Sequence, residues 1–389
     1  MTGLEGSATQ AAADPHLLTV LHAAERTGPP LFALQFLRWL REHHPEWRTS
    51  TLFLDAGGSL TDEFAELGPV VVAGDLAPYA PGGRATHRAH VRKQLRLLRA
   101  EVAQLGPIDV AHIHCAGSMR AYPALPSGPV LCHLHELDVG LDLHLGPLAR
   151  EHLSAAERYL AVSDGVRDAF LARVAVDPAR VERRWGFVDA RRLPDAVERG
   201  DLGLDPQAFV VASSGVRHWR KAPELFVRTA LAARRLAPEV PWHFVWVGGA
   251  DAGGLEDLVA EAGLDDLVAF LPHQPDPLRW IAAADVFFLP AREDAFPLVC
   301  VEASALGRPI VTFDNGGAAE LVAAADSGRV VSFPDVEAAA RALAELAHAD
   351  EERQALGERA RAFAHEHLLL EQAGPALHAA IEATREVSW

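Results

Sequence analysis

The sequence predicts an α/β protein of two doubly wound domains, on three observations. With 389 residues the chain is too long for one compact core, and its 49% hydrophobic content is enough to fill two. Short β-branched runs alternate with longer amphipathic segments, which is typical of parallel sheets covered by helices. Residues 188–205, rich in charges and turn formers, interrupt this alternation near its middle and predict a domain boundary there.

The first half of the chain predicts a domain over residues 1–190, in which residues 1–15 are a loose polar tail rather than a signal peptide. Helices are expected at residues 31–43, after a Gly-containing loop, and over the basic segment Arg84–Ala100. The expected strands are 16–23, 49–56, 69–73, 107–114, 129–135 and 157–163.

The second half predicts a similar domain over residues 191–370, followed by a terminal helix at 371–389 that could pack back onto the first domain. Helices are expected at 223–236, 255–262, from Pro297, and after Gly317. The expected strands are 209–215, 242–249, 267–272, 284–290 and 309–313. Ligands of such domains bind at the carboxyl ends of the strands.

Charge and composition exclude some partners. The net charge of −17 disfavours nucleic acid, because phosphate neutralisation supplies most of that affinity. The segment Arg84–Ala100 could lie on an anionic membrane, but a solvated Arg-rich helix face is the favoured interpretation. Three widely spaced cysteines fit a reducing compartment, and we expect a cytoplasmic protein.

The stretch Ala291–Val311 carries the strongest chemical signal. A strand ends in a loop with Asp294, Pro297 suits the first helical position, Glu302 lies inside the helix, and Gly307 suits its end. A helix N-terminus at this edge of a sheet favours a phosphate. The two carboxylates could accept hydrogen bonds from vicinal hydroxyls of a sugar or a ribose. The alternative is an ordinary acid-rich helix entry.

A second signal is the basic pair Arg220 and Lys221, again between a strand and a helix. The chain has only two lysines among its 36 basic residues, so the retention of Lys221 suggests that arginine does not serve there. Together the pair could hold a diphosphate without a metal ion, with Arg217 as a third candidate cation. The alternative is a basic pair on the surface.

Two weaker signals lie in the first half. Gly28, in the loop before the first helix, would let the backbone approach a ligand closely, although such turns are common for structural reasons. His112 and His114 end one strand and His133 and His135 end another, so alternation places each pair on one face. Four imidazoles could bind a metal, and a metal site would indicate a metal-dependent hydrolase. The neighbouring acids are Glu136 and Asp138, but no carboxylate elsewhere has clear ligand spacing, so a metal is not expected. A further alternative is that the histidines are simply packed or solvated at the strand ends.

Other ligand classes fit poorly. The glycines of WVGGADAGG (246–254) do not match G-x-G-x-x-G, so NAD is not expected. There is no G-x-x-x-x-G-K-[ST] motif for a P-loop, and no convincing D-x-D at a strand end.

The motif Asp294-x7-Glu302, after FFLP and before EA-x-A-x-G-x-P, resembles the E-x7-E signature of retaining glycosyltransferases of family 4. The first acid is Asp here, as in an REDxFPLV variant, where many relatives carry Glu. The HWRK stretch that ends at Lys221 resembles the G-x-x-x-W-R-K segment of the same family. The resemblance covers nearly the whole chain and implies the GT-B fold, in which two Rossmann-like domains face each other across a cleft.

The resemblance also implies roles. His135 (with His133 as fallback), Asp294 and Lys221 would be catalytic, with Glu302 on the donor ribose and Lys221 and Arg220 on its diphosphate. The remaining donor-side residues would be Gly28, Phe270 near the base, and Phe296, Pro297 and Leu298 at the helix start. The acceptor side would include His133, Glu136 and Arg120.

The implied activity is retaining, metal-independent transfer of a sugar from a nucleoside diphosphate donor, UDP rather than GDP, in bacterial natural-product or envelope glycan biosynthesis. No cofactor is expected. A small molecule or a glycan is the expected acceptor, membrane association is not favoured, and the oligomeric state is open. Two alternatives are a sugar-nucleotide 2-epimerase or hydrolase on the same fold, and a non-catalytic sugar-nucleotide-binding protein.

Overall fold

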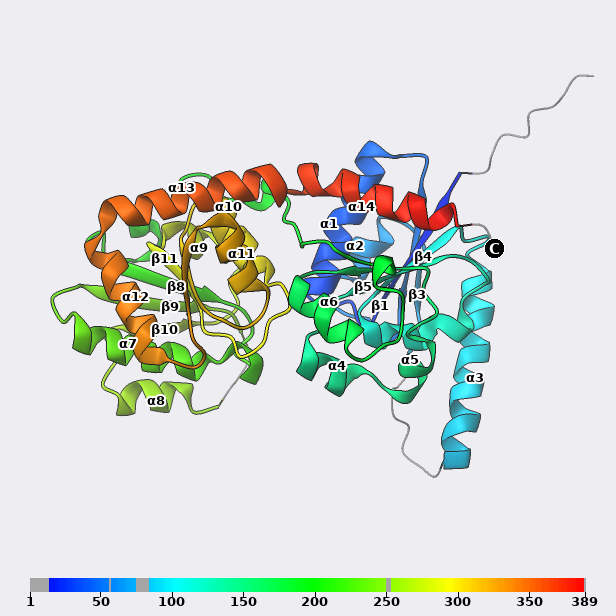
Figure 1. Cartoon of the computed structure of the whole chain (residues 1–389), viewed down its shortest axis with the longest axis horizontal. Helices are drawn as coiled ribbons and strands as arrows, with labels where there is room; N and C mark the ends of the chain where they lie inside the picture. Colours follow the sequence, from blue (N-terminus) through cyan, green and yellow to red (C-terminus); the bar gives the residue numbers. More distant parts are fainter. Residues whose placement is uncertain (1–13, 56, 75–83, 250–252, 388–389) are drawn as a thin grey trace, which may run out of the picture.

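The computed structural model describes residues 14–55, 57–74, 84–249 and 253–387. They form two α/β domains, side by side, each a fully parallel sheet with helices on its faces (Figure 1). The predicted two-domain α/β architecture is confirmed.

The N-terminal sheet has seven strands in the order β3-β2-β1-β4-β5-β6-β7. The order reverses between β1 and β4, so their carboxyl ends form a crevice where ligands bind in this class of sheet. All six predicted strands are present, and β7 is an additional short one. The strands are β1 (His16–Leu21), β2 (Arg48–Phe53), β3 (Val70–Val72), β4 (Val110–His114), β5 (Val130–Leu134), β6 (Arg158–Ala161) and β7 (Val181–Arg183).

Helix α1 (Gly28–His43) carries most of the apolar cover on one face of this sheet, burying Phe32, Phe36 and Trp39 among others. It begins three residues before the predicted start, because Pro29 and Pro30 are compatible with a first helical turn, whose N–H groups have no intrahelical partner. The other helices are α2 (Thr61–Ala65), α3 (Arg84–Ala103), α4 (Asp138–His144), α5 (Pro147–His152) and α6 (Asp164–Leu171), with 3-10 segments η1 (Ala116–Ala124) and η2 (Pro178–Arg180).

The C-terminal sheet has six strands in the order β10-β9-β8-β11-β12-β13, and its order reverses between β8 and β11. Its crevice therefore lies at the two loops that the sequence singled out, after residues 214 and 289. The strands are β8 (Phe209–Ser214), β9 (Trp242–Val247), β10 (Val268–Leu271), β11 (Val286–Leu289), β12 (Ile310–Phe313) and β13 (Gly328–Val331). The helices are α7 (Pro223–Leu236), α8 (Leu255–Glu261), α9 (Leu278–Ala283), α10 (Leu298–Ala305), α11 (Gly317–Ala325) and α12 (Val336–His348).

Two connections cross between the domains. One is the linker after β7, with its 3-10 segments η3 (Ala190–Arg192) and η4 (Arg199–Leu202), and the other joins α13 (Asp350–His367) to α14 (Leu370–Arg385). The connections pair with each other, because Val188 N donates to Leu368 O (3.0 Å) and Leu370 N donates to Val188 O (2.9 Å). The two connections between the domains therefore form a small parallel β-bridge.

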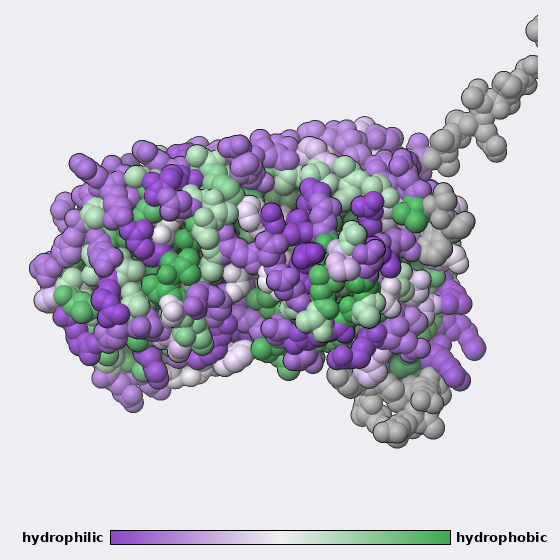
Figure 2. All heavy atoms as spheres, viewed as in Figure 1, coloured by the Kyte–Doolittle hydropathy of each residue, from purple (hydrophilic) through white to green (hydrophobic). Residues whose placement is uncertain are grey.

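The terminal helix α14 packs on α1 of the N-terminal domain, where Gly374 lies against the indole of Trp39. A Cβ at position 374 would come within 2.8 Å of that ring, so glycine is needed for this close approach. The outer surface of α13 and α14, along the top of Figure 2, is mostly hydrophilic. Within the described part of the chain, no helix combines the length and apolar content needed to cross a bilayer.

Candidate active site

The loops after β8 and β11 meet at an ion pair between Lys221 and Asp294. Lys221 lies in the 3-10 segment η5 (Trp219–Lys221), and both side chains are about one-fifth exposed. The backbones of the two loops are joined as well, since Arg292 N donates to Arg220 O at 2.7 Å. The structure therefore brings together two residues that the sequence assigned separately.

The loop that carries Asp294 is also fixed by the loop after β12. Asn315 Nδ2 donates to Arg292 O (2.7 Å), and Gly317 N donates to Asp294 O (3.0 Å). Gly316 has a φ of +86°, and a Cβ there would lie 2.2 Å from Asp294 O. Only glycine fits such a position, so the Asp294 loop and the start of α11 form one rigid unit.

The chain segments beneath Lys221 are glycines, which present only backbone atoms. Gly215 and Gly248 have φ values of +136° and +151°, and a Cβ on Gly248 would lie 2.1 Å from Gly215 O. Trp246 Nε1 donates to the same carbonyl (2.9 Å), which fixes the ends of β8 and β9 against each other. This glycine pair was not predicted from the sequence, although glycines directly after two adjacent strands were the available signal.

Glu302 lies in α10 with only 8% of its surface exposed. Burial raises the pKa of its carboxyl to about 7, opposed by the positive charge of Arg192. Arg192 belongs to the interdomain linker, and its Nη1 lies 3.5 Å from Glu302 Oε1. Nothing in the linker sequence marked Arg192 as a partner of the site.

The start of α10 differs in detail from its prediction. Pro297 caps the helix, with ψ of 114°, and the first helical residue is Leu298. The ring of Phe296 stacks on Trp185 (centroids 6.1 Å apart), and both Phe296 and Leu298 pack against Gly186. These two side chains therefore contact the linker, and their place on the donor side remains a prediction.

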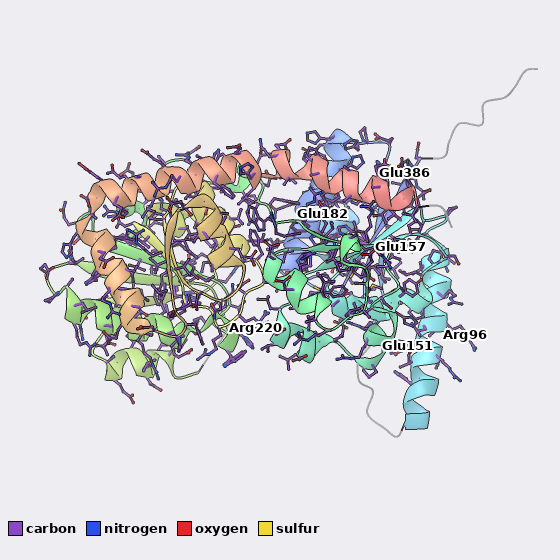
Figure 3. The ribbon with its side chains drawn as sticks, in the orientation of Figure 1. Arg96, Glu151, Glu157, Glu182, Arg220 and Glu386 are labelled. Atoms are coloured by element: carbon purple, nitrogen blue, oxygen red, sulfur yellow. The ribbon has the colours of Figure 1, made fainter. Side chains whose placement is uncertain are left out.

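Three further donor-side candidates belong to the C-terminal domain, and two of them, Arg217 and Phe270, are partly buried. Arg217 stacks over the ring of Phe270 (5.4 Å) and pairs with Glu256 (3.0 Å), so this cation already has an acidic partner. Arg220 is exposed, on the side of its domain that faces the N-terminal domain (Figure 3). It adds to the lowering of the His144 pKa, which is due first to burial.

The four histidines of the N-terminal domain form one stack. His112 Nε2 lies 3.3 Å from His133 Nδ1, and His114 Nδ1 lies 3.2 Å from His135 Nε2. The predicted pairing of each strand's histidines on one face is confirmed. The ring of Phe32 packs edge-on against three of them, His114, His133 and His135.

The stack is neutral at ordinary pH. Burial lowers the pKa of His112 and of His135 to about 3, and holds those of His114 and His133 well below the usual value. Ring nitrogens of His112, His114 and His133 lie within 4.8 Å of one another, and Nε2 of both His114 and His133 has no hydrogen-bond partner among the described residues. Neutral imidazoles can ligate a metal, but two of the five ring contacts among these histidines are already hydrogen bonds between ring nitrogens.

The acceptor-side candidates Glu136 and Arg120 are largely buried inside the N-terminal domain. Glu136 Oε2 accepts from Ala116 N (3.1 Å) and His135 N (3.0 Å), and burial raises the pKa of its carboxyl. Arg120 donates to Asp55 Oδ1 (2.8 Å). Glu136 thus joins the loops after β4 and β5, directly next to the histidines, and Arg120 joins the loop after β4 to the loop after β2.

Gly28 is the first residue of α1, and its φ lies outside the left-handed region. In the part of the chain that the structure describes, no heavy atom lies within 4 Å of the position that a Cβ would take, so the space beside it is open there. The close backbone approach expected at Gly28 remains a prediction.

The two halves of the site touch across the domain boundary. Glu293, next to Asp294, accepts hydrogen bonds from Gly140 N (3.0 Å) and Val139 N (3.3 Å). Those amides follow His135 by only a few residues. The loops at the carboxyl ends of the two sheets therefore meet at the domain boundary, close in sequence to Asp294 on one side and to His135 on the other.

Comparison with known proteins agrees with this geometry. Residues 195–363 match the family described as Glycosyl transferases group 1. A D-inositol 3-phosphate glycosyltransferase of Nocardioides sp. is 31% identical over 309 residues, which span 70% of this chain and 68% of that protein. The chain belongs to the group 1 glycosyltransferases.

Other similarities are shorter or more distant. A D-inositol 3-phosphate glycosyltransferase of Saccharomonospora viridis is 33% identical over 225 residues, about half of its own length (52%). Among solved structures, Anabaena Alr3699/HepE in complex with UDP has a TM-score of 0.76 at 17% identity, covering 95% of this chain and 100% of that one. Sucrose-phosphate synthase of Thermosynechococcus elongatus has a TM-score of 0.79 at 20% identity, covering 96% and 100%. The expected GT-B fold and glycosyltransferase class are thereby confirmed.

Proposed function

We propose that this glycosyltransferase moves a sugar from a UDP-sugar to an acceptor hydroxyl, with retention at the anomeric carbon and without a metal ion. The observation that carries the proposal is the placement of Lys221, Asp294 and Glu302 around the crevice of the C-terminal sheet, facing the loop after His135. The donor UDP is supported by the Anabaena protein, whose structure was solved with UDP.

Departure of the nucleoside diphosphate is the step that most needs stabilising. Lys221, Arg220 and the N-terminus of α10 supply fixed positive potential for the negative charge that grows on the leaving phosphate. When donor binds, its diphosphate would compete with Asp294 for Lys221. The released Asp294 carboxylate could then accept a hydrogen bond from the donor sugar.

The other groups orient the substrates. Glu302 would accept hydrogen bonds from the ribose hydroxyls, in place of its contact with Arg192. His135 is neutral, so it would contact the sugar as a hydrogen-bonding group rather than as a cation. In retention without a covalent enzyme intermediate, the acceptor hydroxyl attacks from the face that the diphosphate leaves, and a phosphate oxygen takes its proton.

The relatives indicate a chemical class of acceptor, and this class is what an experiment should test. Those of Nocardioides and Saccharomonospora are named for D-inositol 3-phosphate, a small polyol with a phosphate group. We propose a small polyhydroxylated acceptor for this chain as well.

The decisive experiment measures the release of nucleoside diphosphate from UDP-, GDP- and dTDP-sugars in the presence of EDTA. Each donor is tested with and without an acceptor, which is inositol 3-phosphate or a member of a panel of polyols. Acceptor-dependent UDP release with an α-linked product from an α-linked donor is expected. UDP release or a 2-epimer without any acceptor would support the hydrolase or epimerase, and an absolute need for a divalent metal would overturn the metal-independent mechanism.

A further inference from the structure

We propose that Glu293 and Glu320 form a two-point clamp that holds the two domains in register for catalysis. The clamp itself is inferred from geometry alone. Its expected effect on the kinetics rests on the proposed glycosyl transfer. Both carboxylates belong to the C-terminal domain, and both accept hydrogen bonds from backbone amides at the start of a helix in the N-terminal domain.

Glu320 lies in the first turn of α11, which faces α6 across the domain boundary (Figure 1). Its Oε2 accepts from Asp164 N and its Oε1 from Gly165 N, each at 2.8 Å. The next amide of α6, that of Val166, is capped within its own domain by Ser163 Oγ (3.2 Å). The exposed donors of the first turn of α6 are thus satisfied partly by the other domain.

Glu293 makes the same contact at α4, through the amides of Val139 and Gly140. These amides lie in the segment that begins with His135 and Glu136. One clamp point therefore fixes the expected sugar-contacting histidine relative to Asp294, which is the neighbour of Glu293.

The local charges favour both contacts. Each helix begins with an acidic residue that would repel an incoming carboxylate, but Asp138 pairs with Arg173, and Asp164 lies 3.6 Å from Arg183. The clamp carboxylates then meet N–H groups at the positive end of a helix rather than unpaired acids. Each contact is charge-assisted and bidentate, the stronger kind of hydrogen bonding.

The two clamp points act together because one rigid unit carries them. Gly317 N donates to Asp294 O (3.0 Å), so the loop with Glu293 and the helix with Glu320 move as one body with Asp294. Lys221, Asp294 and Glu302 all belong to the C-terminal domain. Loss of the clamp should therefore leave donor binding nearly intact and impair the step that needs both domains.

The test compares Glu320→Ala and Glu320→Gln with the control Glu345→Ala, which removes an exposed carboxylate from α12. Glu320 is preferred to Glu293 because it is not adjacent to Asp294. Hydrogen–deuterium exchange over residues 163–166, small-angle scattering, UDP affinity and steady-state kinetics would be measured on the full chain.

For Glu320→Ala we expect exchange at Asp164 and Gly165 to become about tenfold faster, with a larger radius of gyration. UDP affinity should stay within about twofold, while kcat/KM for the acceptor falls about tenfold, and Glu320→Gln should lie between. Unchanged exchange and unchanged radius would overturn the clamp, as would equal losses in UDP affinity and turnover. Because exchange and scattering need no substrate, they test the clamp even if the proposed reaction is wrong.

Discussion

Lys221 and Asp294, which are 73 residues apart in the sequence, form an ion pair at the crevice of the C-terminal sheet. Both side chains are mostly shielded from water, so neither charge is fully solvated. In the proposed donor complex, the pair would keep the lysine ammonium positioned for a diphosphate while balancing its charge before donor arrives. We therefore expect its two members to have opposite effects on the binding of an anion.

Replacement of Lys221 by alanine should weaken UDP binding by roughly 1.5–3 kcal/mol, the worth of a hydrogen bond to a charged group. The variant also leaves Asp294 without its cation, close to the expected diphosphate. Lys93→Ala is the matched control, because Lys93 is the other lysine of the chain and is exposed on α3. Calorimetric titration with UDP measures both, and equal affinities for Lys221→Ala and the unmodified protein would remove Lys221 from the donor site.

Replacement of Asp294 by asparagine should have the opposite effect on binding. The ammonium of Lys221 loses its competing carboxylate, so UDP affinity should rise by about fivefold, equivalent to about 1 kcal/mol. Turnover should nevertheless fall, since Asp294 is expected to contact the donor sugar. Asp276→Asn makes the same charge change at an exposed position of the same domain. Weaker UDP binding by Asp294→Asn would show that the carboxylate supports the diphosphate rather than competing with it.

Acid should destabilise the protein through the histidine stack. The pKa values of His112 and His135 are lowered to about 3 from 6.5, so the native state stays neutral while the unfolded chain takes up protons below about pH 6.5. The stability is present above pH 6.5 and is lost as the pH falls toward 3. Each histidine contributes up to about 1.4 kcal/mol per pH unit to this slope.

Urea unfolding at pH 7.5, 6.5 and 5.5 measures the slope. His112→Gln keeps a hydrogen-bonding group opposite His133 but cannot titrate, so its free energy of unfolding should depend less on pH than that of the unmodified protein. His273→Gln, at an exposed position, should leave the slope unchanged. A slope that is identical in all three proteins would show that the stack does not control acid stability.

The architecture was predictable because it follows from local sequence patterns. The period and length of the apolar runs predicted the strands of both domains except β7 and β13. These two strands are only three and four residues long and show little apolar patterning. The loops at Lys221 and Asp294 were found because each stands directly after a strand and before a helix. That both lie at the reversal of strand order follows from topology.

Contacts between the domains were not predictable in this way. Glu293, Glu320 and Arg192 each have partners far away in the sequence, and an acid or arginine on a surface loop has no local mark of a distant partner. Phe296 and Leu298 were predicted on the donor side, and the structure adds a contact of both side chains with the linker, whose position depends on how the domains sit together. Tertiary geometry, rather than sequence pattern, decides these roles.

The raised pKa of Glu302 gives a second pH dependence, of opposite sign to that of the histidines. Its folded value of about 7 lies above the usual 4.5, so the native state favours the protonated carboxyl. Relative to Glu302→Gln, the stability of the unmodified protein should be undiminished below pH 4.5 and should fall as the pH rises through 7, by at most roughly 3 kcal/mol. Ionisation should also strengthen the hydrogen bonds that Glu302 is proposed to accept from ribose. UDP affinity, normalised to that of Glu345→Gln, should therefore rise between pH 6 and 8 in the unmodified protein and stay flat in Glu302→Gln. Parallel affinity profiles for the two proteins would place the ribose away from Glu302.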